Sequence, residues 1–316
     1  MEYHEKNENK LTVWQKLKAA MKLSKKLFTA TIALLIILSI AGIIYVSQFE
    51  EEAPEVKEPE IVTKKTVVPK IGKPKPMPAT ELSLREVAII IDDMGYDLNA
   101  VKKLLKIDAN LTFAILPFQP YSRQASEMLH KAKREILLHL PMEPVSYPRE
   151  KPGEGALFTD MNNEELLLQL RNNIAAVPYV VGVNNHMGSR FMMDDQRLSL
   201  IFKELKRKNL FFVDSRTSPD TKALSVAQAI GLNIAERKVF IDNDRNYNEI
   251  YNHLINVAKS NDDFPQIIIG HPYPETILAL KDAVNVMRKK GVSIVPASQI
   301  IKKNSKRNNS SLIHKQ

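Results

Sequence analysis

Residues 87–95 read Val-Ala-Ile-Ile-Ile-Asp-Asp-Met-Gly, a run of five aliphatic side chains that ends in two adjacent carboxylates. An uninterrupted aliphatic run of this length is typical of a strand buried on both faces of a sheet. In parallel α/β folds, reactive side chains gather where strands end and loops begin. Asp92 and Asp93 therefore mark one such strand end, and similar strand ends should recur along the chain.

Short apolar runs alternate with amphipathic stretches between Glu86 and Ile301. The predicted strands are Val87–Ile91, Thr112–Leu116, Ile136–His139, Tyr179–Val183, Phe211–Val213, Val239–Ile241, Gln266–Ile269 and Val292–Val295. The predicted helices are Asn99–Leu105, Ser122–Lys133, Asn163–Ala176, Gln196–Lys208, Thr221–Gly231, Tyr247–Ser260 and Glu275–Lys290. This alternation indicates a parallel sheet covered by helices. Seven or eight such units favour a (β/α) barrel, with an open doubly wound sheet as the alternative.

The segments outside this domain differ sharply from it in composition. Residues 27–46 form a run of 20 without a charge, which as a helix would span roughly 30 Å, the thickness of the hydrocarbon core. Residues 1–26 carry seven Lys against three Glu, and residues 47–85 are rich in Pro, Lys and Glu. We therefore expect a basic cytoplasmic tail (1–26), a membrane span (27–46), a linker (47–85), a folded domain (86–301) and a basic, disordered tail (302–316).

The charge flanking the apolar run predicts how the chain is oriented. Lys-rich flanks stay in the cytoplasm, so the domain should lie outside it, in the periplasm or on the cell surface. The alternative is a cleaved signal peptide, but the run is longer than the usual apolar region and no Ala-x-Ala-like site follows it. The sequence favours a signal anchor that is retained.

Composition excludes several kinds of protein. Hydrophobic content of 44% and charged content of 26% are those of a globular chain, and the absence of cysteine excludes thiolate chemistry. The net charge of +9 lies largely in the two tails, and no basic stripe interleaved with aromatic residues crosses the middle. We therefore expect no nucleic-acid partner. Glycines are isolated, which disfavours a nucleotide-binding loop.

Three of the seven histidines, His139, His186 and His271, fall at predicted strand ends. Adjacent carboxylates on a strand point to opposite sides, so one of Asp92 and Asp93 could bind a metal while the other faces a substrate. The same pair could instead form a turn or a helix cap. A histidine in an apolar context, such as His139, is commonly a core residue whose ring is satisfied by hydrogen bonds.

Each of the other polar residues near these strand ends could serve either the site or the structure around it. Glu143, four residues after His139, could share a metal or orient a ligand. Arg190 could hold a substrate anion or form a structural salt bridge. Asp214 could orient a histidine, whereas Asp242 and Asp244 fit a turn or cap better. Carboxylate and imidazole ligands with an open position form the ordinary layout of hydrolytic zinc, so the set predicts a metal-centred hydrolase.

Ile91-Asp92-Asp93-Met94-Gly95 resembles the first motif of the carbohydrate esterase family 4 polysaccharide deacetylases, and Ile269-Gly270-His271 resembles the last. The resemblance implies that Asp92 is the catalytic base, Asp93 a metal ligand and His271 the general acid. It also implies a distorted (β/α) barrel. The strings HLPMEP, NNHMGSRF, VDSRTS and GHP resemble the divergent polysaccharide deacetylases more closely, over about residues 86–301.

The second motif departs from the family pattern of two metal histidines four residues apart. His139 matches the first of these histidines, but Glu143 occupies the position of the second. His186 is therefore expected to supply the metal ligand that the second histidine provides in the family. The resemblance then implies a divalent metal, with zinc as first choice, held by Asp93, His139 and His186. Glu143, Arg190 and Asp214 are expected around these ligands or against the substrate.

Two functions of different classes follow. The first is a metal-dependent hydrolase that removes N- or O-acyl groups from a cell-envelope polysaccharide. The second is a catalytically inactive glycan-binding or envelope-organising protein on the same scaffold. A metal-dependent hydrolase of another bond is a third, which the altered ligand set permits.

Overall fold

The computed structural model describes residues 31–32, 85–260 and 265–304. Contacts divide the chain into Met1–Met77, of which only the helical residues 31 and 32 are described, and Pro78–Gln316. The described residues contain no helix with the length and apolar character needed to cross a bilayer. Apart from residues 31–32, 85 and 302–304, the predicted N-terminal tail, span, linker and C-terminal tail lie outside the described residues.

One sheet of nine parallel strands forms the centre of the domain. Eight strands follow the order β6-β5-β4-β3-β2-β1-β8-β7, and β9 pairs with the start of β1. The strands are β1 (Arg85–Met94), β2 (Thr112–Ile115), β3 (Glu135–Met142), β4 (Gly182–Met187), β5 (Phe211–Asp214), β6 (Ile234–Glu236), β7 (Val239–Phe240), β8 (Gln266–Gly270) and β9 (Val292–Ile294).

The sheet curls into a distorted barrel, and its two edge strands, β6 and β7, are joined by a short link. β6 ends at Glu236 and β7 begins at Val239, yet these strands stand at opposite ends of the strand order. The linking Arg237 N–H donates to Asp214 O at 2.9 Å, and the Lys238 N–H donates to Ile267 O at 2.7 Å. The predicted barrel is therefore confirmed as a curled half-barrel, and the open doubly wound alternative is wrong.

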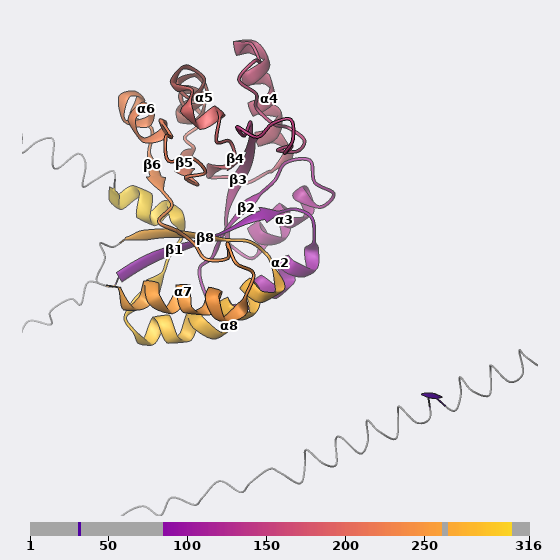
Figure 1. The fold of residues 1–316 in the computed structure, drawn as a ribbon, viewed down its shortest axis with the longest axis vertical. Helices are drawn as coiled ribbons and strands as arrows, with labels where there is room; N and C mark the ends of the chain where they lie inside the picture. Colours follow the sequence, from indigo (N-terminus) through magenta and orange to yellow (C-terminus); the bar gives the residue numbers. More distant parts are fainter. Residues whose placement is uncertain (1–30, 33–84, 261–264, 305–316) are drawn as a thin grey trace, which may run out of the picture. The chain divides into compact units, whose positions relative to one another are not determined.

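Helices cover the outside of the sheet (Figure 1). They are α2 (Leu98–Leu104), α3 (Ser122–Lys131), α4 (Asn163–Ala176), α5 (Asp195–Arg207), α6 (Ala223–Ile230), α7 (Tyr247–Lys259) and α8 (Pro274–Lys289), with a 3-10 turn η1 (Phe191–Met193). A last helix covers residues 297–304. Each predicted helix is present, because each carries an apolar face at helical spacing.

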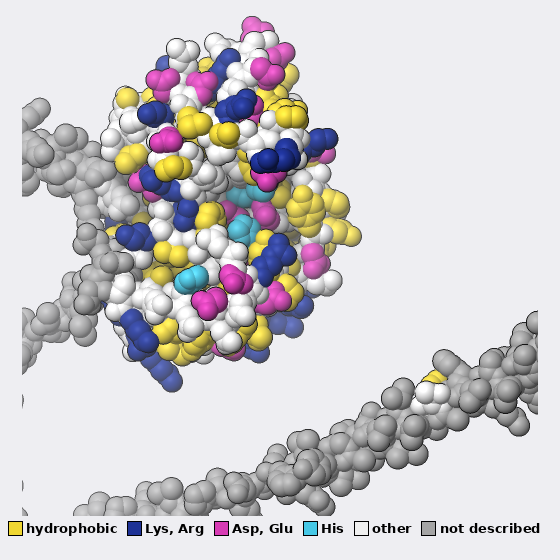
Figure 2. Space-filling view, in the orientation of Figure 1, with side chains coloured by type: hydrophobic (Ala, Val, Ile, Leu, Met, Phe, Trp, Pro, Cys, Tyr) yellow, Lys and Arg dark blue, Asp and Glu magenta, His cyan; other side chains and the backbone are white. Residues whose placement is uncertain are grey.

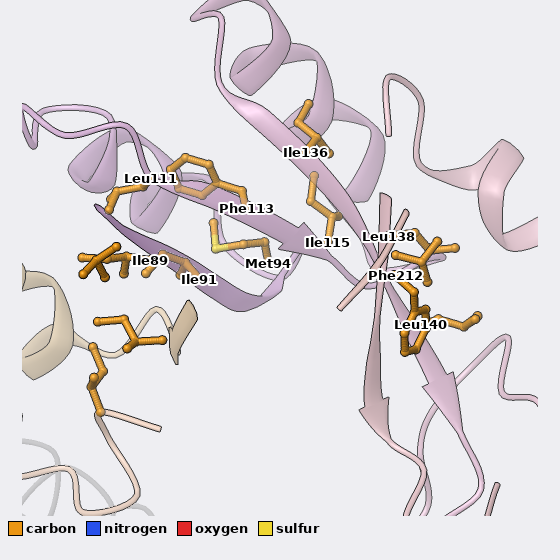
Figure 3. Packing of buried hydrophobic residues seen from close by; sticks show 14 of the residues in the cluster. Ile89, Ile91, Met94, Leu111, Phe113, Ile115, Ile136, Leu138, Leu140 and Phe212 are labelled. Carbon is orange, nitrogen blue, oxygen red and sulfur yellow. The ribbon is translucent and has the colours of Figure 1, made fainter. Parts of the chain in front are cut away.

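Alternation along the strands divides the apolar residues between two cores. Val87, Ile89 and Ile91 of β1 face outward into the larger core beneath the helices, part of which is drawn in Figure 3. Ala88 and Ile90 belong to a second core inside the barrel, together with Val295, Ala297, Ile300 and Ile301 from the C-terminal segment. This C-terminal segment therefore fills the end of the barrel where the strands begin, and leaves the ends of the strands for polar side chains.

Replacing Ile300 by Ala should lower the free energy of unfolding by about 2–5 kcal/mol, because it empties a fully packed position inside the barrel. Chemical denaturation followed by circular dichroism measures the change. Lys302→Ala is the matched control, since Lys302 is exposed on the same helix and should change stability by less than about 0.5 kcal/mol. Equal effects of the two changes would contradict the placement of Ile300 in a core.

Several strands extend further than predicted, and one was missed. β3 continues to Met142, so His139 lies within its strand rather than at the last residue of it. β4 runs from Gly182 to Met187, so His186 lies within a strand rather than after one. The polar run Asn184-Asn185-His186 hides the strand, because its inward side chains serve a site instead of a core. β6 has only three residues and no apolar run, which explains why the pattern did not reveal it.

Candidate metal centre

A bulge at the end of β1 brings both carboxylates to the same place. The register of β1 against β2 shifts between Ile91 and Met94, and Asp93 adopts a left-handed backbone with φ of 54°. Asp92 Oδ2 lies 3.6 Å and Asp93 Oδ1 lies 3.2 Å from the Nε2 atom of His139. The expectation that these carboxylates face opposite sides is wrong, because the bulge breaks the alternation of the strand.

His139 on β3 and His186 on β4 complete a compact cluster with Asp93. Nδ1 of His186 lies 3.1 Å from Nε2 of His139 and 3.1 Å from Oδ1 of Asp93. Three ligand-type atoms therefore form a nearly equilateral triangle with sides of 3.1–3.2 Å. Figure 2 shows histidine and acidic side chains side by side near the centre of this face.

The three atoms fit one divalent ion. Ligand bonds of about 2.0–2.2 Å separate neighbouring ligand atoms by about 2.8–3.6 Å, from octahedral to tetrahedral geometry. Oδ1 of Asp93 is buried, and no described residue donates a hydrogen bond to it, although two imidazole nitrogens face it. Asp93, His139 and His186 are also the residues whose ligand atoms group closely enough to share an ion among those described. That they bind one stays a prediction.

The electrostatics of the cluster follow from burial and close charges. Burial alone would raise the pKa of Asp93, but the imidazoles of His139 and His186 hold it far below its ordinary value. Burial alone would lower the pKa of His139, but the carboxylates of Asp92 and Asp93 raise it to about 8. The carboxylate ligand is thus ionised at neutral pH, whereas His139 must lose a proton to bind a metal.

Zinc affinity should therefore rise by about tenfold per pH unit between pH 6 and pH 8 and then level off, because the ion competes with one proton on His139 below its pKa of about 8. Asp93 adds no slope in this range, since its pKa is lowered. Competition with a chromophoric chelator at several pH values measures the affinity. An affinity independent of pH would show that His139 is not a ligand.

Asp92 lies beside the cluster in a different environment. Its side chain is 2% exposed, and its Oδ1 accepts a hydrogen bond of 2.8 Å from Asn184 Nδ2. Burial raises the pKa of Asp92, and the nearby histidines only partly oppose this. A carboxylate with a raised pKa is a better proton acceptor than a solvated one, which suits the base role that the sequence predicts.

His271 follows β8 and faces the cluster from the other side. Its Nε2 lies 4.0 Å from Asp93 Oδ2, and its Nδ1 lies 2.9 Å from Asp242 Oδ1. Asp242 also accepts hydrogen bonds from the His271 backbone N–H at 2.5 Å and from Thr276 Oγ1 at 2.8 Å. Burial would lower the pKa of His271, but the hydrogen bond and charge of Asp242 raise it. The imidazole thus holds a proton more firmly than a free histidine does, which suits an acid.

Glu143 is not placed to replace a ligand. Its Oε2 accepts the Thr159 backbone N–H at 2.7 Å and Thr159 Oγ1 at 2.6 Å, and its Oε1 pairs with Arg190 at 3.1 Å. Glu143 therefore links the loop that contains Thr159 to the one that contains Arg190. Arg190 forms the structural salt bridge, which was one of the two roles predicted for it. Of the two ligand readings for the second motif, the geometry favours His186.

Asp214 does not orient a histidine. Its carboxylate accepts the Arg216 backbone N–H at 2.8 Å and the Thr221 hydroxyl at 2.8 Å, so it organises the loop after β5. The orienting role falls to Asp242, for which a turn or cap was the expectation; only Asp244 behaves so, by accepting the Asn246 N–H at 3.1 Å.

Sequence reasoning missed the roles of Asn184 and Asp242. Asn184 lies opposite His139 in the pairing of β3 with β4 and contacts both His139 and Asp92. The only sequence signal was position: both residues belong to polar runs that follow aliphatic ones. Neither run reveals the order of the strands in the sheet. The sequence therefore does not show which side chains come into contact.

Known proteins are similar to this chain in sequence. A family model described as divergent polysaccharide deacetylase matches residues 89–301. The uncharacterized protein YibQ of Escherichia coli strain K12 is 34% identical over 220 residues, which cover 68% of this chain and 67% of the relative. An uncharacterized protein of Haemophilus influenzae is 32% identical over 199 residues, covering 62% of this chain and 70% of the relative.

A solved structure has a fold similar to that of this chain. The family match also covers the residues of the candidate site. An uncharacterized protein of Agrobacterium tumefaciens C58 superposes with a TM-score of 0.64 at 22% identity, over 68% of this chain and 88% of its own. The matched residues contain Asp92, Asp93, His139, His186 and His271. The chain belongs to the divergent polysaccharide deacetylase family.

Proposed function

We propose that this protein is a metal-dependent hydrolase that removes N- or O-acyl groups from a cell-envelope polysaccharide. The observation that carries the proposal is the triangle of ligand-type atoms from Asp93, His139 and His186. The buried carboxylate of Asp92 lies beside this triangle, and so does the imidazole of His271, which is held by the carboxylate of Asp242. Family membership supports a carbohydrate substrate, because the family model describes polysaccharide deacetylases.

The chemistry divides among groups with distinct environments. A divalent ion held by Asp93, His139 and His186, with zinc as the first choice, would supply a Lewis acid that polarises the acyl carbonyl and acidifies water. Asp92 accepts the proton of the attacking water, since its raised pKa makes it a competent base. His271, whose pKa is raised by its hydrogen bond to Asp242, donates a proton to the leaving amine or alcohol.

The test combines metal content with product release. The full chain, purified in detergent, is measured for zinc before and after chelation and is then assayed for acetate released from acetylated glycans. Bound metal with acetate release that chelation abolishes is the expected result. Bound metal without acetate release would favour a hydrolase of another bond. Failure to bind any divalent ion would overturn the proposal in favour of a glycan-binding or envelope-organising protein.

We also propose that the chain is anchored by residues 27–46, with the domain outside the cytoplasm. The support is the uncharged run and its Lys-rich N-terminal flank. Protease added to spheroplasts should remove the domain and spare an N-terminal tag placed before residue 27. A domain that stays intact until the spheroplasts are lysed would show the opposite orientation.

A further inference from the structure

We propose that Asn184 is a positioning residue that uses the two ends of one amide to hold His139 in its metal-binding tautomer and to hold the base Asp92 in place. This inference rests on the proposed metal site, and it goes beyond it by naming what prepares that site. Its evidence is the set of contacts around one fully buried side chain.

Asn184 lies on β4, beside the strand that carries His139. Its side chain is 0% exposed and stands opposite His139 in the pairing of β3 with β4. Its Nδ2 lies 2.8 Å from Asp92 Oδ1 and 3.3 Å from Ser215 Oγ, and its Oδ1 lies 3.0 Å from His139 Nδ1. Both ends of the amide are therefore engaged, each by a group with its own role in the site.

The chemistry of the partners decides which way the amide points. The amide directs its NH₂ group at Asp92 Oδ1 and Ser215 Oγ, two oxygens that can accept a hydrogen bond. The carbonyl oxygen then necessarily faces His139.

The amide orientation in turn selects the tautomer of His139. An oxygen that can only accept requires a hydrogen on Nδ1 of a neutral His139. The Nε2 atom then carries the lone pair, and it is this atom that lies 3.2 Å from Asp93 Oδ1 and 3.1 Å from His186 Nδ1. Metal-binding histidines generally donate their other N–H to an oxygen, which fixes the ring and strengthens the ligand.

The other end of the amide acts on Asp92. The bond from Nδ2 occupies Oδ1 of Asp92, and Oδ2 is the oxygen directed toward the cluster, 3.6 Å from His139 Nε2. A neutral amide suits this position because two carboxylates, Asp92 and Asp93, already lie here. A third acid would repel them, and an apolar side chain would leave buried polar groups unpaired.

The variants separate the two ends of the amide. Asn184→Leu removes both contacts at similar volume. Asn184→Asp keeps an oxygen acceptor for His139 but removes the donor to Asp92. Asn173→Leu is the matched control, since Asn173 is a buried amide of α4 that donates 2.7 Å to Gly155 O and lies outside the site. Zinc affinity by chelator competition, thermal stability and, for acyl-glycan turnover, kcat and KM are measured on the full chain.

We expect zinc affinity to fall about 10–100-fold in Asn184→Leu, to stay within about threefold of the parent in Asn184→Asp, and to be unchanged in Asn173→Leu. In Asn184→Asp we expect kcat to fall at least about 100-fold with zinc bound, because Asp92 loses its donor and shares a proton with the new acid. Long-range ¹H–¹⁵N spectra should report the Nδ1–H tautomer of His139 in the parent and a mixture in Asn184→Leu.

Equal zinc affinities in the parent and Asn184→Leu, or a parent His139 protonated on Nε2 instead, would overturn this inference. If Asn173→Leu lowers zinc affinity as much as Asn184→Leu, the effect is one of stability and the inference fails. A parent chain that binds no divalent ion overturns the proposed function itself, which distinguishes the two failures.

Discussion

Asp92→Asn should lower kcat for acyl release by about 100- to 10,000-fold while zinc content stays at that of the parent, because it removes a base and no ligand. The new amide is nearly isosteric, and its oxygen can still accept the 2.8 Å hydrogen bond from Asn184. The buried position should therefore tolerate the change. The assay is acetate release at saturating substrate, with zinc measured on the same sample.

Asp97→Asn is the matched control for this change. Asp97 is an exposed N-cap of α2 whose Oδ1 accepts the Asn99 N–H at 2.7 Å, and asparagine caps helices equally well. Its replacement should leave both kcat and zinc content unaltered. Loss of zinc in Asp92→Asn would make Asp92 a ligand instead of a base, and unaltered kcat would exclude it from the reaction.

The order of elements and the fold class were predictable because strand and helix patterns differ in period and strands buried on both faces are continuously apolar. The unpredictable parts are those where local pattern and tertiary role diverge. The strand predicted at Tyr179–Val183 lies at Gly182–Met187 in the structure. The prediction ended too soon because the inward residues Asn184 and His186 are polar, and their partners come from other strands. The topology of the whole domain determines which strands are neighbours, and a short stretch of sequence does not contain that information.

The candidate site shows the same division. Asp93, His139 and His186 could be grouped in advance because a residue type and a strand end are local properties. The shared direction of Asp92 and Asp93 could not be foreseen, since it depends on a bulge against β2 and a left-handed φ at Asp93. The exchange of roles between Asp214 and Asp242 has the same origin, because only Asp242 stands beside the β8 end that carries His271.

His186→Ala should abolish stable zinc binding, because it removes one of three ligand atoms from a triangle with sides of 3.1–3.2 Å. Glu143→Ala should retain zinc, since neither of its oxygens is free to bind a metal. Its effect should instead be a loss of about 1–3 kcal/mol in the free energy of unfolding, as Thr159 and Arg190 lose their partner. Zinc content after gel filtration and denaturant titration measure the two effects.

The pair of variants distinguishes two ligand sets with opposite outcomes. If Glu143→Ala loses zinc while His186→Ala retains it, the ligands are Asp93, His139 and Glu143, with the acid four residues after the histidine taking the place of a second imidazole. His130→Ala controls for loss of a histidine as such, because His130 lies on α3 and stacks on Tyr179 at 3.8 Å, outside the cluster. It should keep zinc in either case, so a loss there would mean that zinc content follows folding and not ligation.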